Sequence, residues 1–113
     1  MKPKIKARWI AALRSGEYTQ GRGQLRDGDK FCCLGVLCDL HTNLTHKADW
    51  EGEYYAGQSR SSLPRIVAEW AGVNDDDPEL NDAPASVWND GTNDEDIKPH
   101  SFLEIADLIE AYL

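Results

Sequence analysis

Thiol and imidazole groups are the side chains of this sequence best suited to chemistry, and four of them fall within ten residues. Cys32, Cys33, Cys38 and His41 share a run that is almost free of charge. Such groups bind zinc, but on a helix Cys38 would lie about 140° around the axis from Cys33, so the side chains would diverge. No second pair of spaced ligands accompanies them. We therefore expect no metal site and no cofactor.

A reactive thiol is a second possibility for the same run. Cys32 or Cys33 would begin a helix there, and the positive end of its dipole together with Lys30 would lower the thiol pKa. The flanking Phe31 and Leu34 instead predict burial, which raises a thiol pKa and blocks access. An odd number of cysteines also argues against a disulfide framework. We expect buried thiols and no catalytic residue, with a thiol-dependent enzyme using Cys32 or Cys33 as the alternative.

A glycine-rich stretch offers an anion site of low specificity. Backbone N–H groups of Gly21-Arg22-Gly23, with the side chains of Arg22 and Arg26, could hold an anion or a nucleotide. The stretch lacks the length and the Lys-Ser/Thr ending of a phosphate-binding loop. A turn is the simpler interpretation, and anion binding by Arg22 and Arg26 stays open.

Carboxylates dominate the last third of the chain. The net charge is −8, made up of +3 in residues 1–73 and −11 in residues 74–113. A field of this sign repels nucleic-acid phosphates and anionic membranes, so we expect neither as a direct partner. A protein with a basic surface is the natural counterpart, although acidic loops also serve solubility alone. The candidate partner-binding residues lie in two acidic runs: Asp75, Asp76, Asp77, Asp94, Glu95 and Asp96.

Apolar spacing predicts a mostly helical α+β domain. Residues 4–14, 31–40 and 63–71 repeat apolar residues at helical intervals, and Gly35 would let another segment approach the second of these helices closely. The second helix is apolar all round, so it should lie at the centre. Ser101 and Glu104 form a capping-box pattern at the start of the last helix.

The remaining segments predict little regular structure. We expect a short strand at residues 85–89 that pairs with the glycine-rich segment, and a weak hairpin within residues 42–61. The expected architecture is a single domain over residues 1–113, with three or four helices and a short antiparallel sheet or hairpin. Its expected core consists of ten residues: Trp9, Leu13, Phe31, Leu34, Leu37, Ile66, Val67, Trp70, Ile105 and Ile109.

Four strings in order resemble a family of short proteins encoded by bacteriophages and prophages. They are YTQGRG, FCCLGVLCDL, LPRIVAEWAG and SFLEIADLIEAYL, of which the second is the most specific. The resemblance implies an accessory protein that acts inside an infected bacterium, and it carries over no catalytic residues. The family tends to join its Asn-Asp turn closely to the Ser-Phe start of the last helix, whereas here residues 92–100 intervene.

These observations favour a cytoplasmic binding protein over an enzyme. No apolar run approaches the roughly 20 residues that span a bilayer, and the basic first fourteen residues lack a signal-peptide core. We expect an accessory protein that modulates a host protein, such as a basic nucleic-acid enzyme or a defence component, through its acidic surface. The oligomeric state stays open.

Overall fold

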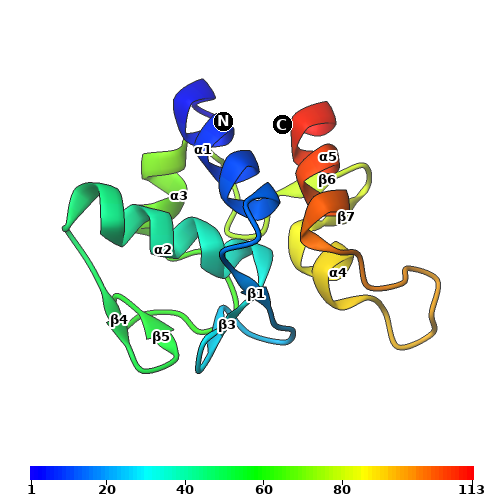
Figure 1. The fold of residues 1–113 in the computed structure, drawn as a ribbon, viewed down its shortest axis with the longest axis horizontal. Coiled ribbons are helices and arrows are strands. Elements are labelled where there is room, and N and C mark those ends of the chain that lie inside the picture. The colour runs from blue at the N-terminus through cyan, green and yellow to red at the C-terminus, as the bar shows by residue number, and fades with distance from the viewer.

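A computed structural model describes all residues, 1–113. The chain forms five helices and seven two-residue strands. Figure 1 shows how the helices are arranged. The helices are α1 (Pro3–Arg14), α2 (Cys33–Thr45), α3 (Arg65–Ala71), α4 (Ala85–Asp90) and α5 (Phe102–Tyr112). The strands are β1 (Thr19–Gln20), β2 (Arg26–Asp27), β3 (Lys30–Phe31), β4 (Trp50–Glu51), β5 (Tyr54–Tyr55), β6 (Glu79–Leu80) and β7 (Ala83–Pro84). The predicted α+β class is confirmed, with five helices instead of three or four.

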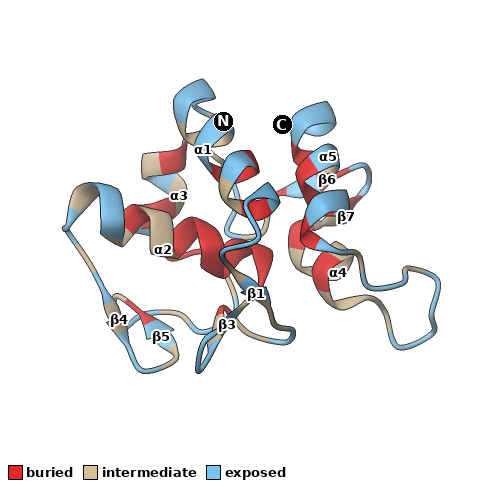
Figure 2. Ribbon diagram, viewed as in Figure 1, coloured by how far each residue is buried: buried red, intermediate tan, exposed pale blue.

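Helix α2 lies at the centre of the molecule, as its uncharged sequence predicts. Residues 32–38 are all buried, and α1, α3 and α4 pack around them (Figure 2). Gly35 is needed there because a Cβ at this position would lie 1.8 Å from the carbonyl oxygen of Leu25. The predicted close approach at Gly35 is therefore confirmed.

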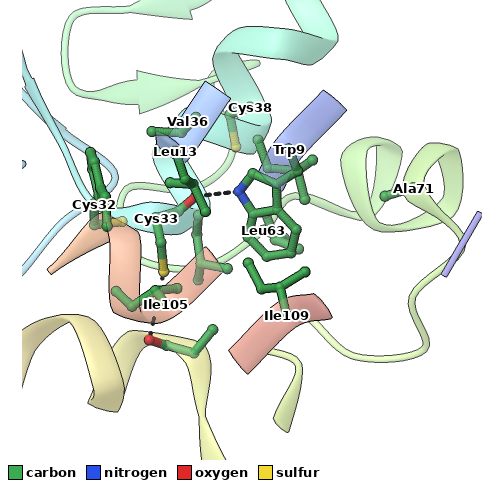
Figure 3. Packing of buried hydrophobic residues seen from close by; sticks show 14 of the residues in the cluster. Trp9, Leu13, Cys32, Cys33, Val36, Cys38, Leu63, Ala71, Ile105 and Ile109 are labelled. Carbon is green, nitrogen blue, oxygen red and sulfur yellow. Dashed lines mark hydrogen bonds between the residues drawn. The ribbon is translucent and has the colours of Figure 1, made fainter. Parts of the chain in front are cut away.

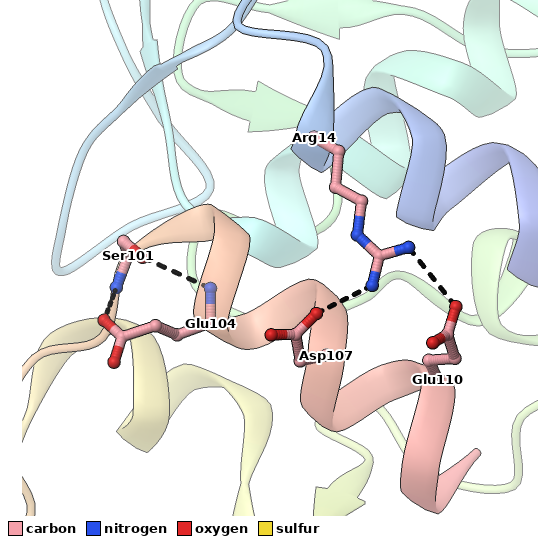
Figure 4. A network of polar contacts seen from close by, with 5 residues as sticks. All are labelled: Arg14, Ser101, Glu104, Asp107 and Glu110. Atoms are coloured by element: carbon pink, nitrogen blue, oxygen red, sulfur yellow. Dashed lines mark hydrogen bonds and ion pairs between the residues drawn. The ribbon is translucent and has the colours of Figure 1, made fainter.

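Helix α1 packs along α5 and seals one side of this core. Trp9 is fully buried, and its indole Nε1 donates to the carbonyl oxygen of Cys33, 2.9 Å away (Figure 3). Ile105 and Ile109 of α5 are also fully buried. The helix begins with the predicted capping box: Ser101 Oγ accepts from the Glu104 N–H, and a Glu104 carboxylate oxygen accepts from the Ser101 N–H (Figure 4).

The strands form three small sheets. In the first, β3 pairs with β1 in parallel and with β2 in antiparallel orientation. The others are the hairpins β4–β5, which lies within the segment where a weak hairpin is predicted, and β6–β7. None of the helices has the length and apolar character that crossing a membrane requires.

The predicted strand at residues 85–89 is wrong, because these residues form α4. The backbone N–H of Ser86 donates to an Asp77 carboxylate oxygen 3.0 Å away, which caps the first turn. Asn89 is buried on the inner side of the helix. The segment therefore cannot pair with the glycine-rich stretch as a strand, and it contacts that stretch through side chains instead.

Three of the ten predicted core residues are only partly buried. Ile66 is 36% exposed, because the buried face of the two-turn helix α3 centres on Val67 and Ala71. Phe31 and Trp70 are only half-buried and border the core. The other seven predicted core residues are buried.

Candidate functional site

The loop that joins α4 to α5, residues 91–100, presents three of the candidate carboxylates to solvent. Asp94, Glu95 and Asp96 are exposed, and the loop projects from the edge of the molecule beyond α4 (Figure 1). We call this segment the acidic loop. It also contains one cation, Lys98.

Hydrogen bonds within the acidic loop hold its shape. The Thr92 N–H donates to the Ile97 carbonyl oxygen at 2.9 Å, and the Ile97 N–H donates to Thr92 Oγ1 at 3.0 Å. The nearby Thr92 hydroxyl and the Asp96 N–H, which donates to Asp94 Oδ1 at 3.2 Å, hold the pKa of the Asp94 carboxyl below its usual value. Its charge is therefore retained at and below neutral pH.

The base of the acidic loop is fixed to α4. Gly91 has φ +77°, and a Cβ there would lie 2.7 Å from the Pro99 ring, so glycine suits both its backbone and its contact. The His100 N–H donates to the Trp88 carbonyl oxygen at 2.8 Å, and the two rings stack edge to face at 4.9 Å. The two ends of the acidic loop therefore lie close together, both against α4.

Asn89 joins this base to the centre of the molecule. It is fully buried, and its Oδ1 accepts from the Cys33 N–H at 3.1 Å and from Gln20 Nε2 at 3.0 Å. Its Nδ2 donates to the Gly21 carbonyl oxygen at 2.9 Å and to an Asp90 carboxylate oxygen at 2.8 Å. From the sequence, Asn89 is only the last residue of an expected strand; this role was missed because three of its four partners are distant in sequence.

The other acidic run, residues 75–77, divides into structural and exposed groups. Asp77 is half-buried and accepts from both the backbone N–H and the hydroxyl of Ser86, so it holds α4 in place. Burial raises the pKa of the Asp77 carboxyl, while the bonds from Ser86 lower it. Asp75 and Asp76 are exposed and border a surface hollow beside α3. Through Asp77 this run contacts the start of α4, whereas the acidic loop follows the end of α4.

Two of the three carboxylates of α5, Asp107 and Glu110, form ion pairs within the molecule. Arg14 of α1 bonds Asp107 at 2.7 Å and Glu110 at 3.2 Å (Figure 4). Apart from these two, the molecule has one ion pair, between Arg65 and Glu69. None of the six candidate carboxylates has a cation within 4.0 Å.

The three thiols are part of the core. Cys32 is 3% exposed, and Cys33 and Cys38 are fully buried, so the predicted core role is confirmed. Burial raises the pKa of Cys32 to about 11 and raises those of Cys33 and Cys38 well above the ordinary value. At neutral pH all three are protonated and shielded, which argues against a reactive thiol. No three His, Cys, Asp or Glu side chains lie close enough together to hold a metal ion.

Arg22 and Arg26 do not come together in one anion site. Arg22 is exposed in the glycine-rich loop, whereas Arg26 is half-buried in β2, where its guanidinium lies against the rings of Phe31 and Trp50. A cleft beside β2 is lined by Arg26 but not by Arg22.

A protein family described as a domain of unknown function, DUF8296, matches residues 1–113. Because the match covers the whole chain, the protein belongs to this family. No curated protein and no solved structure matches the chain.

Proposed function

We propose that this protein is a phage-encoded accessory protein that binds a basic surface of a bacterial host protein through the acidic loop. The observation that carries the proposal is the uncompensated negative charge of a loop whose shape is already fixed. The similarity of the sequence to bacteriophage and prophage proteins supports the bacterial cytoplasm as its place of action.

Charge compensation distinguishes the acidic loop from helix α5. Asp107 and Glu110 share Arg14, whereas Asp94, Glu95 and Asp96 have no cationic partner. Uncompensated carboxylates on a projecting loop attract a basic surface and speed its approach. Because the loop is held by its own hydrogen bonds, less conformational entropy is lost on binding.

A groove that holds nucleic acid is a suitable target for such a loop. Its lysine and arginine side chains are spaced to contact successive phosphates, and three consecutive carboxylates offer a comparable row of negative charge. We therefore propose a nucleic-acid enzyme or a defence component as the class of host protein. The thiol-dependent alternative has less support, because its cysteines are protonated and shielded.

Capture from a bacterial lysate with three forms of the protein tests the proposal. The first is wild type, and the second carries D94N, E95Q and D96N. The third is a control with the same change in charge at exposed acids elsewhere, E17Q, D29N and E51Q. We expect a basic protein to be retained by wild type and by the control, lost with the loop variant, and released at high salt, as identified by mass spectrometry.

The captured protein is then purified and its affinity for each form is measured by calorimetry. Binding that is equal for the loop variant and wild type would contradict the role of the acidic loop. The proposed function would be contradicted if no captured protein depended on these three carboxylates for its retention.

A further inference from the structure

Arg26 is held in place by two aromatic rings and has no carboxylate partner. Its Cζ lies 5.5 Å from the Phe31 ring centroid and 5.4 Å from that of Trp50. Its Nε donates to the Gly28 carbonyl oxygen at 2.8 Å, and the side chain forms no ion pair. The guanidinium is therefore oriented, while its two Nη groups have no hydrogen-bond partner in the protein.

The rings that hold Arg26 are themselves fixed. Trp50 Nε1 donates to Asp39 Oδ1 at 3.1 Å, and Phe31 packs edge to face against Tyr18 at 5.2 Å. Tyr18 in turn donates from its hydroxyl to Asp39 Oδ2 at 2.6 Å. One carboxylate on α2 thus orients aromatic groups from two other segments.

Arg26 and Trp50 border a cleft of about 340 Å³ between the turns of two hairpins. Gly28 in the β2–β3 turn and Gly52 in the β4–β5 turn form its walls, and a Cβ at either position would meet nothing within 4 Å. The walls therefore leave the cleft open at the tips of the turns. Glu53 is the remaining lining residue and supplies one negative charge.

We propose that this cleft binds a small aromatic carboxylate with a single negative charge. The free Nη groups of Arg26 match a carboxylate, which accepts two parallel hydrogen bonds from a guanidinium. The Trp50 ring supplies a surface for the planar part of the ligand. Glu53 repels a second negative charge, so a phosphate dianion is the poorer ligand. This inference is independent of the acidic loop.

Nuclear magnetic resonance with benzoate as the probe tests the proposal. The indole N–H of Trp50 and the Nε–H of Arg26 are the reporters. We expect both signals to shift and saturate with a Kd of about 1 mM, the range accessible to so small a ligand. Benzamide, which has the same shape without the charge, should produce no saturable shift, and phenyl phosphate should bind more weakly than benzoate.

Two variants assign the effect to Arg26. R26Q should weaken benzoate binding at least about tenfold, because it removes a charge-assisted pair of hydrogen bonds. The matched control is R60Q: Arg60 also lies over an aromatic ring, that of Tyr54 at 6.0 Å, but outside the cleft. This variant should bind benzoate as wild type does.

A further variant, E53Q, tests the proposal through a gain of binding, which does not depend on how R26Q affects the hairpin. E53Q removes the only negative charge of the cleft, so phenyl phosphate should bind it several-fold more tightly than it binds wild type. Three results would each overturn the proposal: no saturable benzoate shift in wild type, an equal response in R26Q, or unchanged phenyl phosphate binding in E53Q.

Discussion

Asn89 shows how one buried amide can determine the position of an exposed surface. Its oxygen and nitrogen serve α2, β1, the glycine-rich loop and Asp90 at once, and no buried side-chain polar atom of the molecule lacks a partner. The acidic loop begins two residues later. The placement of its carboxylates therefore depends on a residue that contacts no solvent.

Removing this amide should cost much more than an ordinary surface substitution. N89A leaves the Cys33 N–H and the Gly21 carbonyl oxygen without this partner inside the protein, so we expect a loss of about 3 kcal/mol or more in the free energy of unfolding. Urea denaturation measures it. N93A, at an exposed position in the acidic loop, should change stability by less than about 0.5 kcal/mol. Equal effects of the two substitutions would contradict the central role of Asn89.

At the scale of elements, local patterns predicted those parts of the fold that local physics determines. The capping box of Ser101 and Glu104 and the apolar periodicity of α1, α2 and α3 are properties of neighbouring residues, and all were predicted from the sequence. Helix α4 was missed because Val87 and Trp88 suit a strand and Asp90-Gly91 suits a turn. Its helical form depends on Asp77 and on the distant partners of Asn89, which no local pattern contains.

The glycine-rich segment passes over α2 at Gly35, and this contact decides whether G35A stabilises or destabilises the protein. Helix propensity alone predicts that G35A would stabilise the protein by about 1 kcal/mol. The added Cβ would instead lie 1.8 Å from the Leu25 carbonyl oxygen, which belongs to buried backbone. We expect a net loss of about 1–3 kcal/mol in the free energy of unfolding, measured by urea denaturation. A gain in stability would show that the two segments are further apart.

The packing of the β4–β5 hairpin on α2 should make stability depend on pH. His41 is 1% exposed, its Nδ1 lies 2.7 Å from the Tyr55 hydroxyl, and burial lowers its pKa below 6.5. The unfolded chain therefore takes up a proton before the folded one does. The stability that neutral His41 contributes is complete above pH 6.5 and is lost as the pH falls through the folded-state pKa.

Thermal or urea unfolding between pH 7 and pH 5 measures this dependence. Wild type should lose stability over the interval, and H41N should lose less of it. H46Q, at an exposed histidine, should follow wild type. A wild-type stability that rises as the pH falls from 7 to 5 would contradict the assignment of His41 as a buried neutral side chain.

At the scale of the whole molecule, the sequence shows the sign of the charge but not its compensation. The net charge of −11 in residues 74–113 follows from the composition alone. The pairing of Asp107 and Glu110 with Arg14 instead requires α1 and α5 to lie side by side. The same is true of Asp77, which is acidic in sequence and structural in the fold. Of the two acidic runs, only residues 94–96 expose all three carboxylates without a cationic partner, so the proposed binding surface centres on the acidic loop.

Chemical-shift mapping with the captured host protein tests that claim most directly. Isotope-labelled protein is titrated with the purified partner at low salt, and its backbone amide signals are followed. We expect the largest changes on residues 92–98, and we expect them to disappear at high salt. Changes centred on another surface, with residues 92–98 unaffected, would contradict this claim.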